Sequence, residues 1–183
     1  MERVADRLRE FGFDVLLLRN KKGRPPSTHP CSKLQDNRWL VGLDVGLNIG
    51  LAVLSKTQAL LAHKKCADFQ SSLLSIRDAI NLIIPHSSLL IVEGAYCPSY
   101  KAVFLCGFAC GVGYNGGVEV VLIPPHKKPP VRKIKSGAER LNRFMEEAKR
   151  WYEWEGKPTT GMAHSVSAFG VIEAYLEAQD GTV

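Results

Sequence analysis

Two acidic residues in this chain each end a short apolar run and are each followed within two residues by glycine. Asp44 ends the run that begins at Val41, and Glu93 ends the run that begins at Leu89. Short apolar runs of this kind predict buried strands. A carboxylate at the end of a buried strand is costly unless it has a partner. A bound cation is a natural partner, so the two carboxylates predict a Mg²⁺ site.

A histidine and a serine near the C-terminus have a spacing that would bring them to one face of a helix. His164, Ser167, Ala168 and Val171 fall at positions i, i+3, i+4 and i+7 of a predicted helix over residues 162–176. The imidazole could bind a metal ion or act as a general acid or base near neutral pH. The serine hydroxyl could hold a metal-bound water. A purely structural role for a lone histidine is the competing interpretation.

Positive charge is concentrated in two segments on either side of a neutral middle. The formal net charge is +6. Residues 126–150 contain nine lysines and arginines against three acids, residues 1–38 contain nine against five, and residues 39–125 contain five of each. Such segments are typical of phosphate contact, although a solvated basic loop would give the same counts. The candidate phosphate-binding residues in the C-terminal segment are Lys127, Lys128, Arg132, Lys133 and Lys135.

The N-terminal basic segment contains a short match to a minor-groove DNA motif. Residues 21–26 read Lys-Lys-Gly-Arg-Pro-Pro and are similar to the core of an AT-hook. In that motif an extended Gly-Arg-Pro segment lies in a narrow A·T-rich groove of strongly negative potential. Arg24 is therefore a further candidate for nucleic-acid binding. A match of this length also arises by chance in a linker rich in proline and lysine, and that interpretation is favoured.

The elements that must position these residues follow from apolar periodicity and turn residues. Residues 1–18 predict a short helix and a strand, and residues 19–37 predict a polar linker. The order of elements predicts an α/β domain over residues 39–183 with a short basic N-terminal extension over residues 1–38, which suits a chain of 183 residues. Within the domain, strands are predicted over 39–43, 49–54, 59–64, 89–93 and 118–123, and helices over 72–84, 100–116, 138–152 and 162–176.

The order of elements and five short motifs resemble the RuvC family of Holliday-junction resolvases, which has the ribonuclease-H-like fold. Residues 42–50 resemble the opening Gly-Ile-Asp-Pro-Gly motif of the family, and Val92-Glu93 resembles its second acidic motif. The resemblance spans residues 40–178 and implies a mixed five-stranded sheet flanked by helices. Residues 107–113 and 118–124 resemble the helix and the strand that follow the second acid in the family. Residues 131–137 resemble its lysine-rich segment, and residues 163–169 resemble its final motif.

The resemblance implies a catalytic centre made of Asp44, Glu93, His164 and Ser167. Asp44, Glu93 and His164 would ligate two Mg²⁺ ions, for which Mn²⁺ could substitute, and Ser167 would assist through a water molecule. The family has an Asp at the position of Ser167, so the chain departs from the pattern at one ligand. The implied reaction is in-line hydrolysis of a phosphodiester that leaves 5′-phosphate and 3′-hydroxyl ends.

The implied substrate is branched DNA in the form of a four-way junction, which needs two symmetric cuts and therefore a homodimer. We expect the helix over residues 100–116, which is rich in small residues, either to form the dimer face or to pack tightly on the sheet. Loss of the final Asp suggests an alternative, a protein that binds branched nucleic acid without cutting it. A further alternative is a ribonuclease-H-fold nuclease that acts on RNA, for example on ribosomal RNA precursors.

The sequence also indicates where the protein acts. No run reaches the roughly 18 apolar residues that a membrane span requires. The charged N-terminus lacks the apolar region of a signal peptide. We therefore expect a cytoplasmic, nucleic-acid-associated protein without membrane contact.

Overall fold

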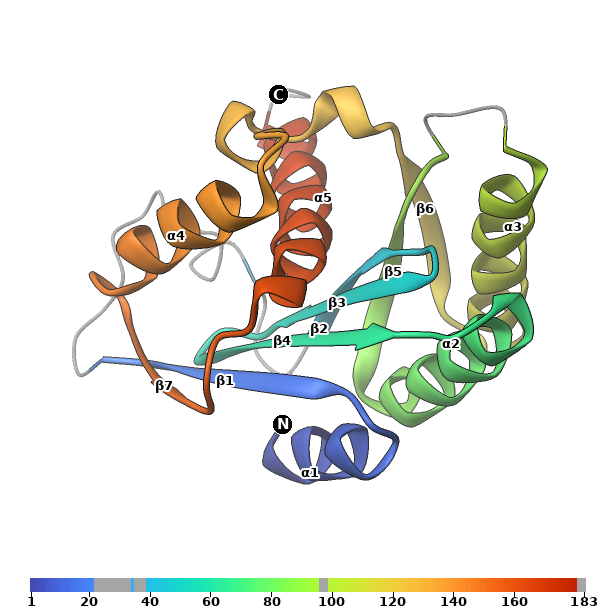
Figure 1. Ribbon diagram of the computed structural model, residues 1–183, viewed down its shortest axis with the longest axis horizontal. Helices are drawn as coiled ribbons and strands as arrows, with labels where there is room; N and C mark the ends of the chain where they lie inside the picture. The colour runs from blue at the N-terminus through green and yellow to red at the C-terminus, as the bar shows by residue number, and fades with distance from the viewer. Residues whose placement is uncertain (22–33, 35–38, 96–98, 181–183) are drawn as a thin grey trace.

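A computed structural model of the chain describes residues 1–21, 34, 39–95 and 99–180. Over these residues it has a seven-stranded sheet with helices against both faces (Figure 1). The strands are β1 (Asp14–Asn20), β2 (Trp39–Asp44), β3 (Asn48–Leu54), β4 (Gln58–Lys65), β5 (Ser87–Glu93), β6 (Glu119–Ile123) and β7 (Tyr152–Glu155). The helices are α1 (Glu2–Glu10), α2 (Phe69–Ile83), α3 (Tyr100–Asn115), α4 (Gly137–Ala148) and α5 (Ala163–Asp180). Four short 3-10 helices lie between these elements: η2 (Ile84–His86), η3 (Pro125–Lys127), η4 (Pro130–Arg132) and η5 (Thr160–Met162).

The sheet is mixed, in the order β6-β5-β2-β3-β4-β1-β7. The strands from β2 through β3 and β4 to β1 and β7 are antiparallel neighbours. β5 and β6 extend the sheet on the other side of β2 as parallel strands. Parallel neighbours need a crossover connection, and α3 supplies it between β5 and β6. No helix in the described ranges is both long and apolar enough to cross a membrane.

The prediction of a mixed α/β fold is confirmed, but the predicted number of strands is wrong, because the sheet has seven strands and not five. One additional strand is β1, whose run Val15–Leu18 is buried. A run that is buried on both faces requires an interior place in a sheet. The other is β7. The helix predicted over residues 138–152 ends at Ala148, and the chain turns into β7 at Tyr152.

The predicted N-terminal extension, residues 1–38, is described in part. Residues 1–20 belong to the same sheet and core as the rest of the chain. β1 lies between β4 and β7, and α1 buries Val4, Ala5 and Leu8. Residues 22–33 and 35–38 lie outside the described residues, and with them Arg24 and the AT-hook-like segment.

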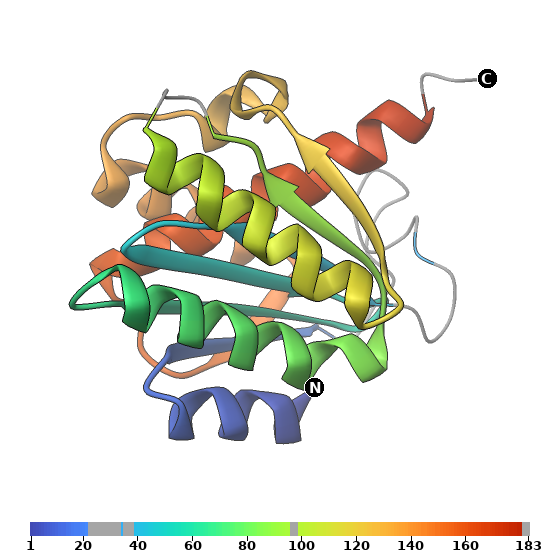
Figure 2. The ribbon, with the colours of Figure 1, turned by 90° about the vertical axis from the view of Figure 1, so that its right-hand side faces the viewer.

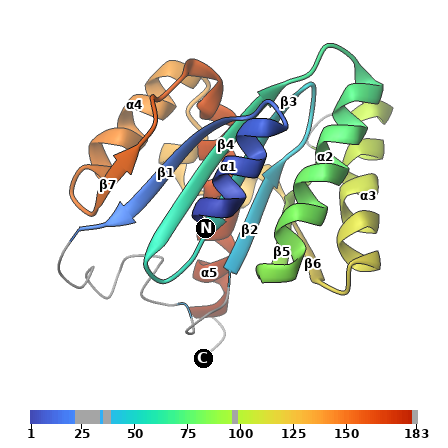
Figure 3. The same ribbon diagram turned by 90° about the horizontal axis from the view of Figure 1, so that it is seen from below.

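Helices cover the two faces of the sheet unequally. α1, α2 and α3 pack on one face, and α4 and α5 pack on the other (Figures 2 and 3). Side chains along a strand alternate between faces. In β2, Val41 and Leu43 therefore belong to the first core and Leu40 to the second. By the same alternation Asp44 faces the side that α5 covers.

α5 lies close to the sheet because two glycines face it. A Cβ at Gly42 would lie 2.1 Å from the carbonyl oxygen of Ala168, and a Cβ at Gly50 would lie 2.2 Å from that of His164. No larger side chain could be accommodated at either position without moving the helix. The Ser165 hydroxyl also donates to the carbonyl oxygen of Ala62 in β4, at 2.6 Å. These contacts fix the position of α5 over β2, β3 and β4.

Candidate functional site

A row of polar residues crosses the sheet beneath the start of α5. Asp44 of β2 is paired with Gly50 of β3, Gly50 with His63 of β4, and His63 with Asp14 of β1. Glu93 extends the row on the other side of Asp44, because β5 runs parallel to β2 and ends level with it. The row therefore joins residues that are far apart in the sequence.

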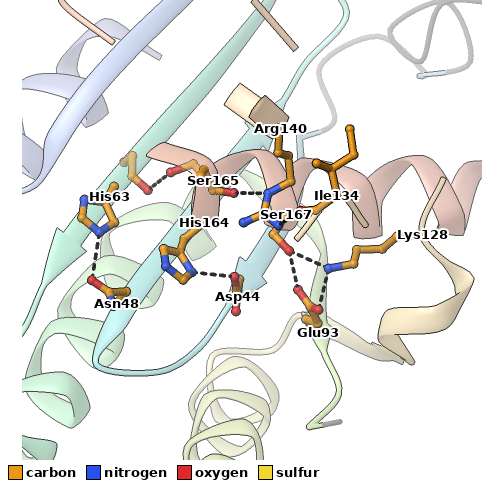
Figure 4. A network of polar contacts seen from close by, with 12 residues as sticks. Asp44, Asn48, His63, Glu93, Lys128, Ile134, Arg140, His164, Ser165 and Ser167 are labelled. Atoms are coloured by element: carbon orange, nitrogen blue, oxygen red, sulfur yellow. Dashed lines mark hydrogen bonds and ion pairs between the residues drawn. The ribbon is translucent and has the colours of Figure 1, made fainter. Parts of the chain in front are cut away.

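His164, in the first turn of α5, lies over this row and is paired with Asp44. Its Nδ1 is 3.1 Å from Asp44 Oδ2 (Figure 4). The His164 side chain is 37% exposed and that of Asp44 is 21% exposed. A hydrogen bond to one ring nitrogen fixes the plane of the imidazole and leaves the other nitrogen for a second partner. The pair is therefore oriented and still reachable from solvent.

His63 supports the His164 ring from β4. The two rings stack with centroids 5.9 Å apart and planes 17° apart. Burial lowers the pKa of His63, and the neighbouring His164 lowers it further, while Asp14 opposes the shift. A Cβ at Gly161 would lie 2.1 Å from His63 Cε1, so the chain leaves just enough room for the ring. A neutral, closely packed His63 can thus hold His164 in place.

Glu93 is held by Lys128 and Ser167 (Figure 4). Lys128 Nζ donates to Glu93 Oε1 at 2.6 Å and to Ser167 Oγ at 2.5 Å, and Ser167 Oγ lies 3.0 Å from Glu93 Oε2. Lys128 is 6% exposed and Ser167 is 4% exposed. Both carboxylate oxygens of Glu93 therefore have a buried partner.

The electrostatic environment of Glu93 favours an added positive charge. Burial raises the pKa of Glu93 above its usual value, and the negative charge of Asp44 raises it further. Lys128 and the hydrogen bond from Ser167 act in the opposite direction. The two carboxylates repel each other in a partly buried place, and a cation beside both of them would relieve that repulsion.

The start of α5 is also held by a residue that the sequence analysis did not single out. Arg140 of α4 donates from Nε to the carbonyl oxygen of Ala163 at 3.0 Å, and from Nη1 to that of Ile134 at 2.8 Å. Arg140 thereby links the segment after η4 to the turn that carries His164. Nothing in the local sequence distinguishes Arg140 from Arg143, the exposed arginine of the same helix.

The predicted basic surface divides into exposed and buried residues. Lys127, Lys133 and Lys135 are exposed. Lys128 and Arg132, predicted to contact backbone phosphates, are instead buried against carboxylates. The Arg132 guanidinium, 3% exposed as a residue, bonds Glu173 at 2.8 and 3.0 Å and Glu147 at 2.8 Å. The physical reason is that the acids paired with Arg132 lie on α4 and α5, which pack over the segment from η3 to η4, while Glu93, the partner of Lys128, ends β5 beneath that segment.

The donor groups of the site suit one divalent cation better than two. Mg²⁺ is commonly bound by one or two carboxylates, with water and substrate phosphate completing its shell. Asp44 and the remaining lone pairs of Glu93 are two such carboxylates, and His164 beside Asp44 could add a nitrogen ligand. In the part of the chain that the structure describes, no three His, Cys, Asp or Glu side chains form a ready metal-binding group. Ser167, at the place of a fourth carboxylate, contacts Glu93 and Lys128.

Comparison with known proteins gives a structural likeness without a sequence match. No family model and no curated protein matches the sequence. Among solved structures, a RuvC from Thermus thermophilus superposes with a TM-score of 0.53, covering 79% of this chain and 97% of that chain, at 16% sequence identity. At that identity the likeness shows the fold alone. The chain has the ribonuclease-H-like fold.

Proposed function

We propose that this chain is a structure-selective DNA endonuclease that resolves four-way junctions by metal-dependent hydrolysis of phosphodiesters. The observation that carries the proposal is the convergence of Asp44, Glu93 and His164 from three distant segments. Two of them end the parallel strands β2 and β5, and the third begins α5. The likeness in fold to the RuvC from Thermus thermophilus supports a nuclease rather than an unrelated use of the same groups.

The proposed ligands of Mg²⁺, or of Mn²⁺ in its place, are Asp44, Glu93 and His164. A bound divalent cation would lower the pKa of a water molecule and stabilise the charge that develops on the phosphate. Asp44 accepts a hydrogen bond from His164 Nδ1 when that nitrogen carries the proton. In the neutral imidazole the other ring nitrogen is then unprotonated and can bind the cation or accept a proton.

The proposed DNA contacts are lysines that neighbour Lys128 in the sequence, together with Arg24. Lys127 precedes Lys128, whose side chain reaches Glu93, so the exposed lysines of this segment are close to the site along the chain. Lys133 and Lys135 follow η4 and are also exposed. Contacts to backbone phosphate supply affinity without reading sequence, which suits an enzyme that selects DNA by shape. Arg24 remains a proposed contact.

A homodimer through α3 would supply the second cut. The exposed large apolar residues on and beside α3 include Tyr100, Val103 and Phe104, with Leu122 on the edge strand β6. Added Cβ atoms at Gly107 and Gly111 would meet nothing within 4 Å, so this side of the helix is not packed against the rest of the chain. Contiguous exposed apolar residues are typical of protein interfaces. The other expectation for this helix is tight packing on the sheet. Gly113 is packed in that way, because a Cβ there would lie 2.6 Å from Leu90 Cδ2.

The test is cleavage of an end-labelled four-way junction beside a linear duplex of the same sequence. We expect metal-dependent nicks, paired across the junction and absent from the duplex. Junction binding without cleavage would favour the alternative that the serine at position 167 marks a binding protein. Cleavage of structured RNA in preference to DNA would favour the other alternative, a ribonuclease-H-fold nuclease that acts on RNA. We propose that the protein acts in the cytoplasm, bound to nucleic acid.

A further inference from the structure

We infer that Lys128 takes the place of a second metal ion in this site, so that each chain binds one divalent cation. This inference rests on the proposed function and concerns the same site. Two-metal hydrolysis of phosphodiesters uses two cations about 4 Å apart, which clamp the attacking and leaving oxygens. Such a pair needs carboxylates on both sides. The site has two carboxylates, Asp44 and Glu93, and the ammonium of Lys128 already lies against one of them.

The contacts of Lys128 are those of a built-in cation. Its ammonium is within 2.6 Å of a carboxylate oxygen of Glu93 and within 2.5 Å of the Ser167 hydroxyl. Ser167 lies at the position where the resemblance leads us to expect a carboxylate ligand. A lysine ammonium is a compact point charge with three N–H donors. Glu93 and Ser167 accept two of these three donors.

The backbone and stem of Lys128 are fixed rather than free to swing away. Lys128 directly follows η3, and its N–H donates to the carbonyl oxygen of Pro125 at 3.3 Å. Proline follows at position 129 and restricts Lys128 to extended backbone. Its stem passes over α5 at Gly170, where a Cβ would lie 3.3 Å from Lys128 Cδ. Four residues later, the ion pairs of Arg132 hold the segment to α4 and α5.

The formal charges of the site favour one added cation. The carboxylates of Asp44 and Glu93 contribute two negative charges and the ammonium of Lys128 contributes one positive charge, while Ser167 contributes none. One divalent cation leaves a single excess positive charge, which one bound phosphodiester neutralises. A second divalent cation would add two further positive charges beside a buried ammonium, with no carboxylate to offset them.

The experiment counts bound Mn²⁺ on the full chain by titration calorimetry and by electron paramagnetic resonance, in the absence of DNA. We expect one Mn²⁺ per chain with the six-line spectrum of an isolated ion. The double variant Lys128→Met with Ser167→Asp removes the ammonium and restores a carboxylate. We expect it to bind two Mn²⁺ per chain with a spin-coupled spectrum. Lys149→Gln, which removes a surface lysine paired with Glu146, is the matched control and should bind one.

Two bound Mn²⁺ in the wild-type chain would overturn the inference, as would none. A folded double variant that still binds one would overturn it as well, and the wild-type count decides the question if that variant does not fold. The count is independent of cleavage. One bound Mn²⁺ in a chain that cuts no junction would support this inference and contradict the proposed function. Two bound Mn²⁺ in a chain that cuts junctions would contradict this inference and support the proposed function.

Discussion

Replacement of Gly42 by alanine should push α5 away from the sheet and separate His164 from Asp44. The added Cβ would lie 2.1 Å from the Ala168 carbonyl oxygen and 2.9 Å from its carbon. Carbon–oxygen contacts settle near 3.3 Å, so the helix must move by roughly 1 Å to relieve the overlap. His164 lies one turn before Ala168 and would move with it. Its 3.1 Å hydrogen bond to Asp44 would then be broken or badly stretched.

The expected size of the effect follows from packing and from geometry. Overpacking a closely packed core costs about 1–3 kcal/mol. A chain of this length loses about 2–4 °C in Tm per kcal/mol, so Gly42→Ala should melt roughly 2–12 °C below the wild type. Misplacement of a catalytic group by about 1 Å can cost about 100-fold in rate. We expect junction cleavage to fall by that order.

The assay combines thermal unfolding by circular dichroism with single-turnover cleavage of a four-way junction. Gln70→Ala on the exposed side of α2 is the control for stability, because a surface substitution away from close packing changes the free energy of unfolding by about 0.5 kcal/mol or less. That control should therefore melt within about 2 °C of the wild type. A Gly42→Ala variant with wild-type Tm and rate would refute the reasoning that close approach of α5 positions the site.

Three further predictions concern charge. Arg132→Ala should lower the free energy of unfolding in urea by about 3–5 kcal/mol, because it leaves Glu173 buried without its cation; a loss below about 1 kcal/mol would contradict this. Burial raises the pKa of Glu173 above its usual 4.5, with Arg132 opposing the shift. Between pH 4.5 and the raised pKa, the folded chain therefore binds more protons than the unfolded chain. The free energy of unfolding of the wild type, relative to that of Glu173→Gln, should fall as pH rises above 4.5. A relative stability that rises with pH would exclude this account. Lys133→Gln should reduce the salt slope of junction binding, log K against log salt, by about 1, and an unchanged slope would remove Lys133 from the DNA contacts.

Controls for these variants are available in the same chain. Arg143 forms an exposed ion pair with Glu139 one turn away on α4. Exposed pairs contribute about 1 kcal/mol or less, so Arg143→Ala should cost far less than Arg132→Ala. A comparable cost for both variants would mean that burial of the Arg132 ion pairs is not what makes them important.

The two acids and the helix over them could be predicted because local pattern determines them. Asp44 and Glu93 each end an apolar run, which predicts a carboxylate at the end of each of two buried strands. His164 and Ser167 could be placed together by helical spacing alone. These signals need only neighbouring residues, and the elements that carry them lie close to their predicted bounds.

The role of Lys128 could not be predicted because it depends on partners far away in the sequence. A lysine in a basic, proline-rich segment has the same local pattern whether it faces solvent or reaches Glu93 and Ser167. The register that pairs His63 with Gly50 is equally non-local. β7 was missed for a different reason. The aromatic residues Trp151 and Tyr152 continue the amphipathic spacing of α4, so the pattern conceals the turn that ends the helix.

The most direct test of the central claim compares the wild-type chain with Asp44→Asn on an end-labelled four-way junction, with linear duplex as control. Cleavage and binding are measured with Mg²⁺, with Mn²⁺ and with EDTA. We predict paired nicks by the wild type in either metal and none in EDTA, while Asp44→Asn binds the junction with similar affinity and does not cut it. Cleavage by Asp44→Asn, or cleavage by the wild type in EDTA, would contradict the assignment of this site as a metal-dependent nuclease centre.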